Sequence, residues 1–167
     1  TVLNQVATLL KAPANTVPQR VETLLKEVRD LKKQLAAAPT KGEMTSEEML
    51  EAAFDVGGTK VVVTEVPGAQ PAAMRQYIDH LRQKASPVAV MLGSAAGGKV
   101  LLVAGVSRDL TKGDGALSAV EWIQPSAELV GGRGGGRPDM AQAGGKDATQ
   151  LAAALEAGRK TIRSLLG

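Results

Sequence analysis

Two uninterrupted apolar runs constrain the fold of this chain more than any other feature. They cover Val88 to Leu92 and Val100 to Ala104, and neither contains a polar residue. A strand with one face in water alternates apolar and polar residues, so a run without alternation predicts a strand covered on both faces. The short, glycine-rich segment from Gly93 to Lys99 between them predicts a β-hairpin. We therefore expect a small sheet with helices around it.

The other elements of this part of the chain follow from periodicity and turn residues. A capping-box spacing between Thr45 and Glu48 predicts a short helix to about Phe54. β-Branched residues predict a strand over 60–66 after a turn at Gly57-Gly58. An amphipathic helix over 71–84 has Met74, Tyr77, Ile78 and Leu81 on one face. A helix within 117–129 is kinked or ended by Pro125, and the last runs from Asp147 to about Leu166, weakened by Gly158.

The N-terminal part is expected to be helical. One helix covers Val2 to Lys11, and a second begins at Thr16 or Val17. Apolar residues of the second helix have the 4-3-4-3-4 spacing of a coiled-coil seam, which contains Val17, Val21, Leu24, Val28, Leu31 and Leu35. About three heptads fit a two-helix hairpin as well as a short coiled coil. Ala36 to Glu43 contains Pro39 and Gly42, which indicates a linker.

These elements define the expected organisation. Residues 1–43 form a helical segment and linker, and residues 44–167 form a globular α/β domain with a mixed sheet flanked by helices. The chain is 44% hydrophobic but has only three aromatic residues, Phe54, Tyr77 and Trp122, so alanine, valine, leucine and methionine must build the core. We expect the chain to be a fragment, because it opens without methionine and within a helix.

Composition excludes several function classes. The absence of cysteine excludes disulfides, thiol chemistry and cysteine zinc sites. No apolar run approaches the roughly 18 residues of a membrane span and no signal peptide is visible, so we expect a soluble cytoplasmic protein. The formal charge of +3 is mild, but residues 131–167 contain six basic and three acidic side chains. This last segment therefore accounts for the whole net charge.

No catalytic constellation is visible. The segment from Gly93 to Lys99 is similar to a phosphate-binding loop, but Val100 replaces the required hydroxyl and a strand follows instead of a helix. His80 is the only histidine, so it cannot belong to a histidine metal cluster. Asp109 and Asp114 are loop acids without a general acid/base arrangement. We expect the chain not to be an enzyme and to hold no cofactor or metal.

The segment from Gly131 to Asp147 is the best candidate for a binding site. It has seven glycines within fifteen residues, together with Arg133, Arg137 and Lys146. Successive glycines can turn backbone N–H groups into one concavity, and guanidinium groups at its rim suit a phosphate or carboxylate. A following helix capped by Asp147 would direct its N-terminal end toward the loop. A flexible surface loop is the alternative.

The motif Gly-Gly-Arg-Gly-Gly-Gly-Arg-Pro-Asp-Met-Ala-Gln-Ala-Gly-Gly-Lys-Asp over 131–147 resembles a signature near the C-terminus of bacterial alanyl-tRNA synthetases. Its domain is shared more loosely with the C-terminal domain of DHH phosphodiesterases. The resemblance covers about Thr59 to Ile162, and the preceding helices fit the same region. It implies a non-catalytic module that binds the elbow of tRNA(Ala) and links aminoacylation with editing. The aminoacylation and zinc-dependent editing motifs are not represented, so ATP, Mg²⁺ and Zn²⁺ belong to the parent enzyme.

The resemblance also implies the contact residues and partners. Matching positions predict nucleic-acid contacts by Gly131, Gly132, Arg133, Gly134, Gly135, Gly136, Arg137, Gln142 and Lys146. The expected partners are tRNA(Ala), the rest of the synthetase chain and a possible second copy, without a membrane. A second hypothesis remains open, in which the chain is a structural or dimerisation module. In that case the heptad seam is the working surface, and the glycines only permit tight packing.

Overall fold

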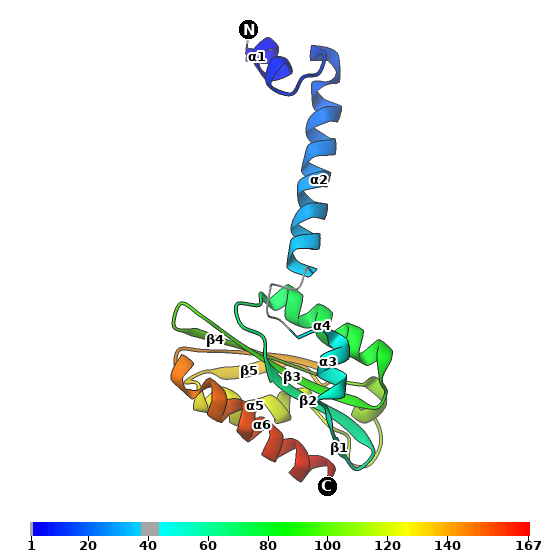
Figure 1. Cartoon of the computed structure of the whole chain (residues 1–167), viewed down its shortest axis with the longest axis vertical. Helices are drawn as coiled ribbons and strands as arrows, with labels where there is room; N and C mark the ends of the chain where they lie inside the picture. The colour runs from blue at the N-terminus through cyan, green and yellow to red at the C-terminus, as the bar shows by residue number, and fades with distance from the viewer. Residues whose placement is uncertain (1, 38–43) are drawn as a thin grey trace. The chain divides into compact units, whose positions relative to one another are not determined.

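The computed structural model describes residues 2–37 and 44–167, which form two compact units. The N-terminal unit contains α1 (Val2–Leu9), the 3-10 turn η1 (Ala14–Thr16) and α2 (Val17–Ala37). Both predicted helices are therefore present (Figure 1). Helix α2 continues to Ala37, so the predicted linker is wrong for Ala36 and Ala37; residues 38–43 lie outside the described part of the chain.

The predicted seam of α2 is covered only near its start. Val17 is buried, but Val21, Val28 and Leu31 are 38%, 45% and 59% exposed, and Leu24 is half-buried. Helix α1 has 8 residues and α2 has 21, or about 12 Å against about 31 Å of helix. The first helix is thus too short to cover the seam. The side chain of Leu35 lies outside the described part, and packing against a second copy stays a prediction.

The globular unit is a six-stranded mixed sheet with helices on both faces. A mixed sheet flanked by helices was predicted, but only three of the six strands were expected. The strands lie in the order β1-β2-β3-β4-β6-β5, where β2 and β3 are parallel and every other neighbouring pair is antiparallel. The elements are α3 (Ser46–Glu51), β1 (Phe54–Val56), β2 (Thr59–Glu65), α4 (Pro71–Lys84), β3 (Val88–Ala96), β4 (Lys99–Val106), η2 (Arg108–Thr111), α5 (Ala119–Leu129), β5 (Arg133–Arg137), β6 (Met140–Gly145), η3 (Ala148–Gln150) and α6 (Leu151–Leu166).

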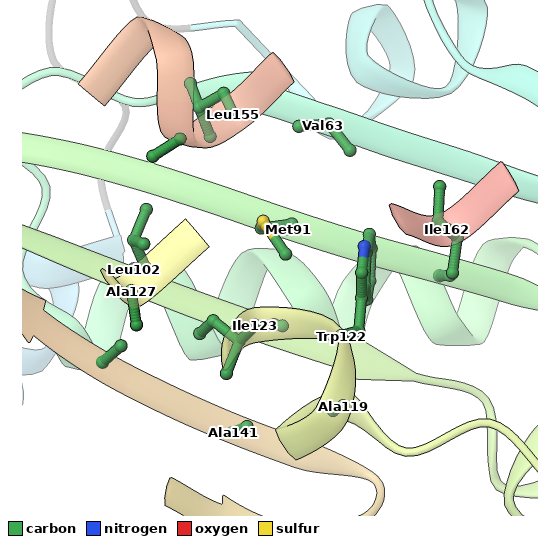
Figure 2. Close-up of a cluster of buried hydrophobic side chains, with 14 of the residues drawn as sticks. Val63, Met91, Leu102, Ala119, Trp122, Ile123, Ala127, Ala141, Leu155 and Ile162 are labelled. Carbon is green, nitrogen blue, oxygen red and sulfur yellow. The ribbon is translucent and has the colours of Figure 1, made fainter. Parts of the chain in front are cut away.

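The apolar runs form the central strands β3 and β4, which are covered on both faces as predicted. Helices α3 and α4 pack on one face, where Met74, Ile78 and Leu81 are fully buried. Helices α5 and α6 pack on the other face. There Met91 of β3 lies among Trp122 of α5 and side chains of α6 (Figure 2). The two faces of the sheet therefore carry separate cores.

Helices α5 and α6 are held together by buried polar contacts. The indole Nε1 of Trp122 donates to the carbonyl of Gly158 at 2.8 Å, and the hydroxyl of Ser126 donates to the carbonyl of Ala154 at 2.8 Å. A Cβ at position 158 would lie 2.6 Å from Sδ of Met91, so glycine at this position permits the close packing of α6. Helix α5 continues through Pro125, which therefore does not end it.

Two sequence-based expectations differ from the structure at local boundaries, and one predicted turn between them is confirmed. Helix α3 has the predicted capping box at Thr45 but ends at Glu51, and Phe54 begins the strand β1 instead. Gly57 and Gly58 have positive φ and connect β1 to β2, so this predicted turn is the turn of a hairpin. Asp147 caps η3 rather than α6 itself, because its carboxylate accepts from the backbone N–H of Thr149 at 3.1 Å.

Candidate nucleic-acid interface

The glycine-rich segment is a β-hairpin at the edge of the sheet. Strand β6 pairs with β4, and β5 pairs with β6 and forms the edge. The predicted concave loop over Gly131 to Gly136 is therefore wrong, because an extended strand does not turn successive N–H groups toward one point. The hairpin instead offers the outward N–H groups of an edge strand and the face of a two-stranded ribbon.

Most glycines of this hairpin are required by packing. A Cβ at Gly132 would lie 1.6 Å from the carbonyl oxygen of Gly144, and one at Gly134 would lie 2.7 Å from Cγ2 of Ile123 in α5. Gly136 has a φ of +144°, and its Cβ would lie 2.5 Å from the carbonyl oxygen of Met140. These three glycines allow the hairpin to form and α5 to pack beneath it, whether or not a ligand binds.

Gly135 differs from the other glycines of β5. Its φ is outside the positive region, and a Cβ there would meet nothing within 4 Å. Neither backbone strain nor packing within the described chain requires glycine at this position. The backbone at Gly135 is therefore an open surface that a ligand can approach closely.

The pleat of the hairpin places the predicted polar side chains on one face. Ala141 and Ala143 are buried against the core under α5, so Gln142 between them lies on the opposite face. The register pairs Gln142 with Gly135 and Met140 with Arg137, which puts these residues on the same face. Helix α4 packs on this face over β3 and β4. Strands β5 and β6 form the part of this face that lies next to the helix.

A cleft of about 540 Å³ lies at this junction between α4 and the hairpin. The hairpin contributes Gly135, Gly136, Arg137 and Gln142, all predicted as contacts. The opposite side is basic as well, since Arg75 and Arg82 of α4 and Arg108 of η2 line it. Its remaining lining residues are Asp79, Asp139, Met140 and Ala141. The lining of the cleft therefore contains four guanidinium groups and two carboxylates.

The four arginines differ in how they are held. Arg82 is 17% exposed, and its guanidinium contacts Asp79 at 3.4 Å. It also contacts both the carbonyl and the carboxylate of Asp139, so it joins α4 to the turn between β5 and β6. Arg137 is 77% exposed, and only its Nε contacts Asp139, at 3.4 Å. Its two Nη groups remain available for a forked contact with a phosphate.

The other two arginines also present charge to the cleft. Nη2 of Arg75 donates to Oε1 of Gln142 at 2.5 Å, which joins α4 to the hairpin. Arg108 is exposed, and its side chain has no hydrogen bond or ion pair with the described residues. The cleft thus combines one structural arginine with three that can meet an anion.

The structure places the other predicted contacts outside this cleft. Arg133 lies on the same face as Arg137 but four residues, or about 13 Å, away along β5. Lys146 is exposed beyond the end of β6. Gly131 forms the positive-φ turn after α5, and Gly132 packs against Gly144.

Sequence reasoning missed Arg75, Arg82 and Arg108, which come from segments distant from the hairpin. One signal was present, because Arg75 and Arg82 are seven residues apart and therefore lie on one side of α4.

Other candidate sites have simple structural roles. Gly97 and Gly98 have positive φ and turn the β3–β4 hairpin, as predicted for the segment similar to a phosphate-binding loop. His80 is exposed on α4. Across residues 2–37 and 44–167, no group of three or more His, Cys, Asp or Glu side chains could hold a metal ion. Nor does a helix in these two ranges have the length and apolarity that crossing a membrane requires.

Residues 58–164 match the DHHA1 domain, and the chain belongs to this family. It is also homologous to alanyl-tRNA synthetase. It is 43% identical over 159 residues to the alanine–tRNA ligase of Rhodopirellula baltica, a match that covers 95% of the chain. The chain spans only 17% of the length of that relative.

The chain is similar to several solved structures, among them a C-Ala domain and RecJ. The C-Ala domain of Aquifex aeolicus alanyl-tRNA synthetase has a TM-score of 0.57 and 29% identity, and the match covers 68% of this chain and 96% of that domain. RecJ of Thermus thermophilus, solved with Mg²⁺, has a TM-score of 0.51 at 20% identity. That match covers 90% of this chain and 21% of RecJ, and at this identity it shows the fold alone.

Proposed function

We propose that the chain is a tRNA-binding module of an alanyl-tRNA synthetase and that the cleft between α4 and the β5–β6 hairpin contacts the RNA. The observation that carries this proposal is a set of exposed arginines around a stretch of backbone that no side chain covers. Arg137, Arg75 and Arg108 line one cleft, and the floor at Gly135 has room for close approach. The homology to an alanine–tRNA ligase and to a C-Ala domain supports tRNA as the ligand.

The chemistry of the cleft suits a phosphodiester backbone. Guanidinium groups bind phosphate oxygens through charge-assisted and often forked hydrogen bonds. The two Nη groups of Arg137 form a second donor edge of the guanidinium, so one phosphate can bind there without breaking the ion pair of Nε with Asp139. The contact is made by side chains and backbone of this chain alone. We therefore expect binding to need no metal or nucleotide cofactor.

We further propose that the part of tRNA(Ala) bound by this cleft is its elbow. Bound there, the module would keep one tRNA attached while its acceptor end moves between aminoacylation and editing sites elsewhere in the parent enzyme. The chain itself is proposed to be non-catalytic. We expect no ATP–pyrophosphate exchange with alanine and no hydrolysis of mischarged tRNA by the isolated chain, and detection of either activity would overturn this part.

The test compares arginine variants with a matched control. Arg137→Ala and Arg108→Ala each remove one exposed cation of the cleft, whereas Lys160→Ala removes an exposed cation from α6, on the opposite face of the sheet. A hydrogen bond to a charged group contributes roughly 1.5–3 kcal/mol, so losing one such contact should weaken tRNA(Ala) binding about 10-fold or more. It should also reduce the slope of log affinity against log salt by about one.

The outcomes separate the proposal from its alternatives. Equal loss of affinity for tRNA(Ala) and an unrelated tRNA in the Arg137 variant indicates a phosphate contact, because phosphates carry no sequence information. Wild-type affinity and slope in folded Arg137→Ala and Arg108→Ala proteins would overturn the proposed surface. Addition of EDTA should change neither quantity.

Dimerisation through α2 is a second candidate function, favoured by the exposed apolar residues Val28 and Leu31. Leu31→Glu tests it, because a residue that is 59% exposed in the single chain tolerates a charge unless a second copy covers it. Gln19→Glu, on the opposite side of α2, is the control. A lower molecular mass in sedimentation for the Leu31 variant alone would support a dimer, and unchanged masses would exclude one through this seam.

A further inference from the structure

The amide of Gln142 is held in one orientation by Arg75. Nη2 of Arg75 donates to Oε1 of Gln142. A guanidinium has donors and no acceptor, so the side of the amide that faces it must be the oxygen. The NH₂ group of Gln142 is then directed away from Arg75. Among the described residues this NH₂ group has no hydrogen-bond partner, and Gln142 lines the cleft.

The surroundings of Gln142 suit a flat group rather than a second phosphate. Gln142 is directly opposite Gly135 in the hairpin register, where no side chain covers the backbone. A planar ring can lie over this bare strand and reach the amide at its edge. The charged side chains of Arg137 and Arg108 bind phosphate more strongly than a neutral amide does. An amide donor at a fixed position instead distinguishes ring edges that present an acceptor from those that present a donor.

We propose that Gln142 reads an unpaired nucleobase and that Arg75 is its positioning residue. The NH₂ group of Gln142 donates to a carbonyl oxygen or ring nitrogen of the base, while Arg137 and Arg108 hold neighbouring phosphates. Unpaired RNA bases expose their Watson–Crick and Hoogsteen edges, whereas in an A-form helix the first are used in base pairs and the second lie in a deep, narrow major groove. This inference rests on the proposed function, because it assigns a role within the same RNA-binding cleft.

The experiment measures discrimination between RNAs. Transcripts of tRNA(Ala) carry single replacements in the two loops that form the elbow, and an anticodon-loop replacement is the control. The wild-type chain should lose about 10-fold in affinity at one elbow position where an acceptor is exchanged for a donor. Gln142→Leu should abolish that difference and leave the salt slope unchanged, because no charge is lost. Gln150→Leu, an exposed glutamine in η3, should keep it.

Four further variants separate donor loss from structural damage. Gln142→Glu keeps an oxygen for Arg75 but replaces the NH₂ donor by a second oxygen. It should reverse the preference at that position. Arg75→Met should lose the same discrimination as Gln142→Leu, the double variant should lose no more, and Arg75→Lys should restore part of it. Retained discrimination in Arg75→Met would overturn the positioning role.

Failure of this inference differs from failure of the proposed function. If the wild-type chain shows no salt-dependent tRNA binding, the proposed function is wrong. If it binds and Arg137→Ala weakens binding, but folded Gln142→Leu keeps the wild-type ratios among transcripts, only the base-reading role is wrong. A wild-type chain that binds every elbow variant equally would also overturn it. Melting temperatures of all variants establish that they are folded.

Discussion

Gly135→Val should make the chain more stable and its RNA binding weaker. A Cβ at this position meets nothing within 4 Å, and the backbone φ is outside the positive region, so the folded state tolerates the side chain. Replacing glycine at a compatible position reduces the conformational freedom of the unfolded chain, which stabilises by about 0.4–1 kcal/mol. Valine also favours an extended strand. We expect the melting temperature to rise by roughly 1–4 °C.

The same valine should obstruct the ligand. Its two methyl groups would project into the cleft beside Arg137 and Gln142, over the bare backbone that we propose the RNA approaches. Loss of one close contact to a charged group corresponds to about 1.5–3 kcal/mol, or at least about 10-fold in affinity. Electrophoretic mobility shift with tRNA(Ala) measures this loss, and circular dichroism measures the melting temperature on the same samples.

Opposite signs in the two measurements make this test strict. A lower melting temperature would show that Gly135 is required by packing, as its neighbours are. A stable variant with wild-type affinity would show that RNA does not approach the strand at this point, and the proposed surface would then be refuted. Gly134→Val is the contrast, since its Cβ would lie 2.7 Å from Cγ2 of Ile123 and should destabilise the chain.

Three further substitutions test the fold by thermal or urea denaturation. Gly132→Ala should abolish native circular dichroism or lower the melting temperature strongly, because its Cβ would lie 1.6 Å from the carbonyl oxygen of Gly144; a native-like melt would contradict this packing. Trp122→Phe removes the buried bond to Gly158 and should cost about 1–3 kcal/mol, whereas an unchanged urea midpoint would argue against that bond. Thr45→Ala removes the side-chain oxygen of the capping box and should cost about 1 kcal/mol, with no loss expected if α3 is not held by its cap.

The strength of the local sequence signal explains which elements were predictable. Helix α4 has the predicted bounds, 71–84, because proline in its first turn and a regular apolar face both indicate the same helix. Strands β3 and β4 contain only apolar residues in their predicted parts and lie at the centre of the sheet. Strand β1 was missed because it has only three residues, Phe54–Val56, although the glycine pair after it is typical of a hairpin.

The β5–β6 hairpin was not predictable from propensity. Its strands are mostly glycine and alanine, which disfavour isolated strands, and tertiary contacts decide the outcome. Ala141 and Ala143 fit beneath α5, while β4 supplies the neighbouring strand. Alternation of these alanines with Gln142 was the available signal. The resemblance predicted Arg137 and Gln142 as contacts, but it did not point to Arg75 and Arg108, which the fold brings beside them in one cleft.

The composition of strand β5 has a consequence for solubility. A free sheet edge can recruit the same strand of another molecule and start aggregation. An antiparallel pair of two β5 strands centred on Gly135 would place Arg133 of one copy opposite Arg137 of the other, twice. Like charges directly opposite each other destabilise a strand pair, and Pro138 prevents extension of the ladder beyond them. The surface kept bare at Gly135 is thus protected from pairing with itself by the charges at both ends of the strand.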